Sequence, residues 1–133
     1  MKIIIGNDHS AVEMKNELVK FLEELGHEVI NVGTDETKSV DYPLFGQAVC
    51  KKVLENKNSL GIAICGTGIG ISIACNKVKG IRAGLCSESF SARMTRKHNN
   101  ANVLCLGARV TGIELAKDIV KTFIEEDFEG GRH

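Results

Sequence analysis

The segment 65–70 places a cysteine directly before a glycine-rich loop. It reads CGTGIG, follows an apolar run and precedes residues with helical periodicity. Glycines leave the backbone N–H groups of such a loop unobstructed at a helix N-terminus, where they stabilise an anion or a developing oxyanion. The same N–H groups favour the thiolate of Cys65, which makes it the first candidate for a nucleophile or base. The alternative is a tight strand-to-helix turn, but three glycines within five residues exceed what one turn requires.

The loop does not match the known nucleotide-binding patterns. Its G-x-G-x-G spacing departs from G-x-G-x-x-G because position 71 is Ile, and it lacks the G-K-[ST] ending of a P-loop. The apolar run before Gly33 ends in Val32 rather than in an acidic residue that could hold a ribose. We therefore expect neither NAD nor ATP as a cofactor.

The remaining cysteines and the histidines are scattered along the chain. There is no C-x-x-C pair, and the four histidines lie far apart in sequence, so neither a disulfide framework nor a metal site is expected. Cys86 ends another apolar run without a glycine loop and is the second candidate thiol. Cys50, Cys75 and Cys105 are interpreted as small buried apolar residues of a protein in a reducing compartment.

Five short apolar runs, which are typical of strands covered on both faces, predict the elements that position these groups. The runs are 2–6, 27–32, 60–65, 81–86 and 102–107. Segments with helical periodicity separate them, at 10–25, from 41 onward, and at 69–77, 89–97 and 111–123. This alternation predicts a single α/β domain over 1–133, a three-layer α/β/α fold with a doubly wound five-stranded parallel sheet.

Capping signals define several helix ends. Ser10 with Glu13, and Thr111 with Glu114, have capping-box spacing at the start of the first and last helices. Gly26 is expected just beyond the end of the first helix, and Pro43 in the first turn of the second.

Ligands of open parallel sheets bind where the strands end, so residues after each strand are site candidates. This edge gathers Asp8, His9, Cys65 and Arg109, although Asp8 could instead cap the first helix. His98 and Asn99 follow the fourth helix and are expected at the opposite edge. If His98 serves the same chemistry it must reach the site of a neighbouring subunit; otherwise it interacts with the dipole at the helix C-terminus.

The overall charge excludes several classes of partner. The chain has 17 basic and 17 acidic residues and a pI near 6.9, which argues against nucleic acid and against adhesion to a membrane surface. No apolar run approaches the roughly 20 residues of a spanning helix, and no signal peptide is evident. We expect a cytoplasmic protein.

Five segments, in the same order along the whole chain, resemble one enzyme family. They are Asn7-Asp8-His9, VDYP at 40–43, ICGTGIGISIACNK at 64–77, RKHNNAN at 96–102 and the final EGGRH. The family comprises sugar-phosphate isomerases that include ribose-5-phosphate isomerase type B and galactose- and allose-6-phosphate isomerases. The resemblance implies an aldose–ketose interconversion through an enediolate, with no metal and no organic cofactor.

The resemblance also implies a role for each matching residue. Cys65 would move a proton between C1 and C2, and Thr67 would assist at the sugar oxygens. His98, helped by Asp8, would open the furanose ring, while Asn99 and Tyr42 would line the sugar. The enediolate oxygen would be held by N–H groups of Gly66, Gly68, Ile69 and Gly70. The phosphate would be bound by His9, Arg109 and Arg132.

Three further expectations come from the same family. One branch uses a glutamate base where Ile71 stands here, so Cys65 indicates the cysteine branch. The site is shared between subunits, which implies a homodimer or homotetramer. Members usually continue beyond the GGRH segment with another arginine, whereas this sequence ends at His133.

Ribose 5-phosphate is the favoured substrate, and three alternatives stay open. They are isomerisation of allose or galactose 6-phosphate, sugar-phosphate binding without catalysis, and a flavodoxin-like redox protein that uses Cys65 or Cys86.

Overall fold

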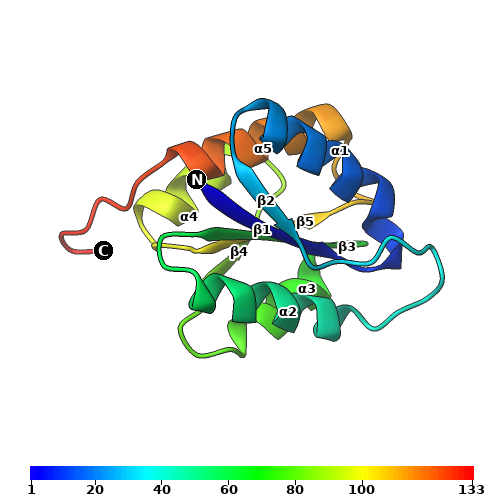
Figure 1. The fold of residues 1–133 in the computed structure, drawn as a ribbon. Helices are drawn as coiled ribbons and strands as arrows, with labels where there is room; N and C mark the ends of the chain where they lie inside the picture. Colours follow the sequence, from blue (N-terminus) through cyan, green and yellow to red (C-terminus); the bar gives the residue numbers. More distant parts are fainter.

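Five parallel strands form one sheet in the computed structural model, which describes all residues from 1 to 133. The strands are β1 (Lys2–Asn7), β2 (Glu28–Asn31), β3 (Leu60–Cys65), β4 (Ala83–Leu85) and β5 (Val103–Gly107). Their order is β2-β1-β3-β5-β4, and every neighbouring pair is parallel. The predicted doubly wound α/β fold is therefore confirmed (Figure 1).

Helices cover both faces of the sheet (Figure 1). They are α1 (Val12–Glu24), α2 (Tyr42–Glu55), α3 (Ile69–Asn76), α4 (Ser89–Lys97) and α5 (Ile113–Glu125), and a 3₁₀ turn, η1 (His9–Ala11), precedes α1. One apolar core joins the sheet to α1, α4 and α5, and a second joins it to α2 and α3. None of these helices is long and apolar enough to cross a membrane.

The central strands explain the continuous apolar runs of the sequence. In β1, Ile3 and Ile5 point into the core under α1 and α5, whereas Ile4 points into the core over α2. β3 and β5 are also fully buried. β2 and β4 are shorter than predicted and partly exposed, because each is an edge strand with a single neighbour.

The predicted capping boxes are wrong. α1 begins after η1 instead of at Ser10, and the carboxylate of Asp8 accepts the N–H of Ser10 at 3.0 Å. α5 begins after Gly112 with no side-chain cap. The C-terminal signal is confirmed: Gly26 has φ +91°, and the N–H groups of Gly26 and His27 bond back to the last turn of α1.

The register of the sheet places Cys65 at its carboxyl edge. Cys65 lies opposite Gly107 at the ends of β3 and β5, whereas Gly61 lies opposite Val103 near their starts. Four residues of strand, at about 3.3 Å each, therefore separate the two edges by about 13 Å.

Candidate active site

The thiol of Cys65 lies against the turn that leads into α3. Its Sγ accepts the backbone N–H of Gly68 at 3.2 Å, and only 5% of the residue is exposed. Gly68 is the residue before α3 and has φ +83°. The sulfur therefore has a direct N–H donor and faces the positive end of the dipole of α3.

Tight packing explains why this loop is rich in glycine. A Cβ on Gly68 would lie 2.4 Å from Leu85 Cδ1 and 2.9 Å from the carbonyl carbon of Leu106. A Cβ on Gly70 would lie 2.7 Å from the ring of Tyr42, so this tyrosine, the first residue of α2, rests directly on the loop.

Two of the loop N–H groups already have partners. The N–H of Gly68 bonds to Cys65, and the N–H of Ile69 donates to Thr67 Oγ1 at 3.2 Å. The N–H groups of Gly66 and Gly70 have no partner within the chain. These two N–H groups are therefore free to donate to an anion, whereas those of Gly68 and Ile69 are already used within the loop.

The residues after β1 border the same loop. Asp8 is buried and accepts from both the N–H and the Oγ of Ser10, the latter at 2.5 Å, so it does cap the helical turn that follows. His9 Nδ1 accepts the N–H of Val40 at 3.1 Å. This bond leaves the hydrogen on Nε2, which can donate to a ligand.

Arg109 brings a positive charge to the glycine loop from the end of β5. Its N–H donates to the carbonyl of Gly66 at 2.9 Å. A Cβ on Gly66 would lie 3.5 Å from Arg109 Nη1 and 3.7 Å from Ser10 Oγ. The guanidinium is thus within reach of an anion on the loop, and its planar fork suits a phosphate.

A cavity of about 340 Å³ opens beside the loop. Thr67, Ile69, Leu85 and Val110 are among its lining residues, and the last three are apolar and partly exposed.

A fully buried lysine, which the sequence reasoning missed, organises the loop before α2. Lys15 of α1 forms an ion pair with Asp35 and donates to the carbonyl of Thr34 at 3.3 Å. Asn7 Nδ2 donates to the same carbonyl at 3.0 Å. The ion pair lowers the pKa of Asp35 below its ordinary value. Position 15 belongs to the apolar stripe of α1, three residues before Leu18. A lysine within such a stripe indicates a buried charge that needs a partner, and this pattern could have identified Lys15 from the sequence.

Three of the other thiols have raised pKa values, which keeps them protonated near neutral pH. Burial and the nearby charge of Glu88 raise the pKa of Cys86 to about 11. The pKa of Cys50 is raised by its hydrogen bond to Cys75 and by burial, and that of Cys75 by its hydrogen bond to Cys105. All five cysteines are free and buried.

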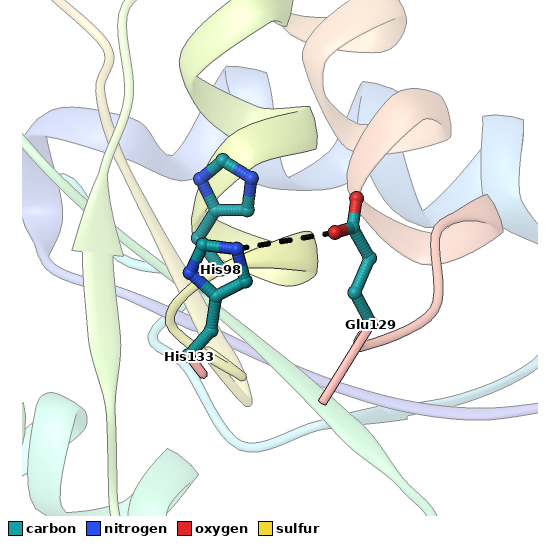
Figure 2. A group of neighbouring side chains, drawn as sticks. All are labelled: His98, Glu129 and His133. Atoms are coloured by element: carbon teal, nitrogen blue, oxygen red, sulfur yellow. Dashed lines mark ion pairs between the residues drawn. The ribbon is translucent and has the colours of Figure 1, made fainter. Parts of the chain in front are cut away.

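Three of the predicted site residues lie away from Cys65 within the chain. His98 directly follows α4, at the edge where β5 begins, and its ring stacks on that of His133 with centroids 4.0 Å apart. Figure 2 shows the two imidazoles beside Glu129. Asn99 follows His98, and its carbonyl accepts Arg82 Nε at 2.6 Å. Arg132 is exposed in the segment after α5.

Comparisons with known proteins agree with the fold. The chain is 49% identical to ribose-5-phosphate isomerase B of Escherichia coli over 132 residues, which cover 99% of the chain and 89% of that protein. It is 47% identical to a putative sugar phosphate isomerase of Bacillus subtilis, with 100% and 90% covered. The structure of Clostridium thermocellum ribose-5-phosphate isomerase B superposes with a TM-score of 0.97 at 54% identity, covering 100% of this chain and 90% of that one.

A family model described as Ribose/Galactose Isomerase matches residues 3–133. The match includes all the helices and strands except the first residue of β1, and the relatives at about half identity cover nearly the whole chain. The protein therefore belongs to the ribose/galactose isomerase family of sugar-phosphate isomerases.

Proposed function

We propose that this protein interconverts ribose 5-phosphate and ribulose 5-phosphate. The observation that carries the proposal is the thiol of Cys65, which accepts an N–H bond beside a glycine loop with two free N–H donors. The similar proteins named ribose-5-phosphate isomerase B support the choice of substrate. The chain would work as a single domain in the cytoplasm.

Proton transfer between the two sugar carbons requires a base and a stabilised enediolate. The thiolate of Cys65 removes the proton from C2 of the open-chain aldose, and the electron pair moves onto the carbonyl oxygen at C1. The N–H groups of Gly66 and Gly70 hold the negative oxygen. Thr67 passes the hydroxyl proton from O2 to O1, and Cys65 returns its proton to C1, which completes the ketose. His9, Arg109 and Arg132 bind the phosphate.

Opening of the sugar ring needs a second acid–base group, which we assign to His98 of another subunit. Within one chain, the edges that carry Cys65 and His98 are about 13 Å apart. A two-fold axis perpendicular to the strands would reverse their direction in the partner, and the partner's edge that carries His98 would then lie beside the Cys65 edge of this chain. Asp8 then assists, and Tyr42 and Asn99 line the sugar.

Exposed apolar side chains at the carboxyl edge supply a surface for this homodimer. Ile69, Leu85, Phe90 and Val110 are each more than two-fifths exposed. Such a concentration of large apolar side chains is typical of a surface covered by another protein chain.

Replacement of Cys65 tests the base. We expect Cys65→Ala to abolish conversion of ribose 5-phosphate while circular dichroism and the unfolding midpoint stay near those of the parent. Cys86→Ala is the matched control, because it removes a buried thiol at the end of a neighbouring strand and should retain turnover. Unchanged turnover of Cys65→Ala would exclude the role of Cys65 as the base.

Replacement of His98 tests ring opening. His98→Asn should slow isomerisation of the ring-closed sugar phosphate far more than that of an aldose phosphate too short to cyclise. Equal losses with both substrates would contradict the assignment.

Mixing two inactive variants tests the shared site. Cys65→Ala and His98→Asn chains, unfolded and refolded together in equal amounts, form heterodimers that contain one intact site. Random pairing makes half of the dimers heterodimers, and each heterodimer has one intact site out of two. About a quarter of the parental activity should therefore return. If each site is built from one chain, the mixture stays inactive.

A panel of sugar phosphates is needed to identify the substrate. The family model covers both ribose and galactose isomerases, so isomerisation of a hexose 6-phosphate is the alternative function. A coupled assay across ribose, allose and galactose phosphates distinguishes them. Saturable binding without turnover of any of these would instead indicate a non-catalytic sugar-phosphate binding protein.

A further inference from the structure

Two histidines that are far apart in sequence meet after α4 (Figure 2). His98 and His133 stack with an interplanar angle of 13°, and His133 Nε2 lies 3.9 Å from Glu129 Oε2. One nitrogen of each imidazole and one oxygen of the carboxylate all lie within 4.8 Å of one another. The spacing of the histidines along the chain predicts no metal site, since only folding brings these three side chains together.

The backbone holds these three side chains together. The N–H of Glu129 donates to the carbonyl of Lys97 at 3.1 Å, which ties the segment after α5 to the last residue of α4. Gly130 and Gly131 have φ of +74° and +61°, a conformation that favours glycine. They reverse the chain, and the N–H of His133 bonds to the carbonyl of Gly130 at 3.3 Å.

The local field also suits a cation. His98 follows the C-terminal end of α4, which is the negative end of the helix dipole. Glu129 adds a full negative charge. Of the neighbouring cations, Arg93 and Lys97 are paired with Glu126, at 3.4 and 3.8 Å. Two other positive charges oppose a bound cation: Arg132, which precedes His133 in the chain, and Arg82, which donates to the carbonyl of Asn99.

We propose that His98, Glu129 and His133 bind one divalent transition-metal ion of the zinc type. Two imidazole nitrogens and one carboxylate oxygen are borderline ligands that suit Zn²⁺ better than Mg²⁺ or Ca²⁺. Metal–ligand distances of about 2.1 Å require donors roughly 3.4 Å apart in a tetrahedron. In the structure the three donor atoms lie within 4.8 Å of one another, and rotation of one imidazole out of the stack brings them to the shorter distance. The fourth position faces solvent and takes water.

The consequence for activity rests on the proposed function. His98 is the group assigned to ring opening, and a nitrogen bound to zinc cannot exchange protons with the sugar. Metal binding therefore inhibits the enzyme. Zinc acts here as a reversible inhibitor and not as a cofactor of the reaction.

Direct binding tests the site without reference to activity. Titration of the intact protein with Zn²⁺ against a coloured chelator should show one site per chain. Glu129→Gln and His133→Ala should each weaken the affinity at least about tenfold. Glu125→Gln, which neutralises an exposed carboxylate at the end of α5, should leave the affinity unchanged. Absence of saturable binding, or equal affinity in all variants, would overturn the site.

Cobalt identifies the ligands. Co²⁺ at this site should give d–d bands without the charge-transfer absorption of a cobalt–thiolate bond. An intense thiolate band would place the metal on one of the cysteines and contradict the proposal.

The inhibitory effect has a separate readout. Zn²⁺ should lower turnover of the parent, and Glu129→Gln should keep parental turnover and need at least about ten times more zinc for the same inhibition. Identical inhibition of both would overturn the regulatory role. A protein that binds zinc as described but has no isomerase activity would contradict the proposed function and leave the metal site intact.

Discussion

The two thiols at strand ends differ in their surroundings. Cys65 accepts the N–H of Gly68, whereas burial and Glu88 raise the pKa of Cys86 to about 11. Iodoacetamide reacts with thiolates, so at pH 8 it should alkylate Cys65 well before Cys86. Peptide mass mapping after timed quenching measures both rates. Equal rates would mean that the glycine loop does not activate Cys65.

The ion pair of Lys15 with Asp35 makes stability depend on pH. The pKa of Asp35 is lowered in the folded protein and has its ordinary value near 3.8 after unfolding. Its stabilising effect is therefore complete above about pH 4 and is lost as pH falls through the folded value. Urea unfolding should show Asp35→Asn less stable than the parent at pH 7, with the difference shrinking below pH 4. A difference that does not change with pH would exclude the ion pair as its cause.

The loop between β3 and α3 depends on Gly68 for two reasons that can be separated. Gly26 and Gly68 both have positive φ, but a Cβ would meet nothing within 4 Å at Gly26 and would overlap Leu85 and Leu106 at Gly68. We expect Gly26→Ala to cost about 1 kcal/mol of unfolding free energy, the backbone contribution alone. Gly68→Ala should cost about 3 kcal/mol and also reduce turnover, since it displaces the loop N–H groups. Chemical denaturation and steady-state kinetics measure both effects, and equal costs would contradict the packing argument.

At the scale of the whole molecule, the exposed apolar edge predicts association. Phe90 and Val110 are 65% and 63% exposed. Val110→Asp should shift the protein from dimer to monomer in sedimentation experiments and lower turnover, because a charge cannot be buried there without a partner. Leu54→Asp, at a half-exposed leucine of α2, is the control and should stay dimeric. If the parent protein sediments as a monomer, the proposal that two subunits share each active site is wrong.

Much of the fold followed from local patterns, because each pattern reports the burial of its own element. The continuous apolar runs predicted the buried strands β1, β3 and β5, and the glycine loop predicted the start of α3. The predicted bounds of the edge strands and the predicted starts of the first and last helices were less accurate. The order of strands in the sheet decides which strands lie at an edge with a single neighbour. The carboxylate of Asp8, and not the side chain of Ser10, accepts a backbone N–H in the first helical turn.

The position of Cys65 between a strand and a helix follows from the chain alone, because the apolar run before it and the glycine loop after it are local patterns. Which groups meet across the chain depends on how the elements pack. Lys15 reaches Asp35 over 20 residues of sequence, and His133 folds back onto His98. The packing of the elements also decides the pKa of Cys86, which depends on burial. Contacts of this kind arise from the packing of whole elements, which no local spacing records.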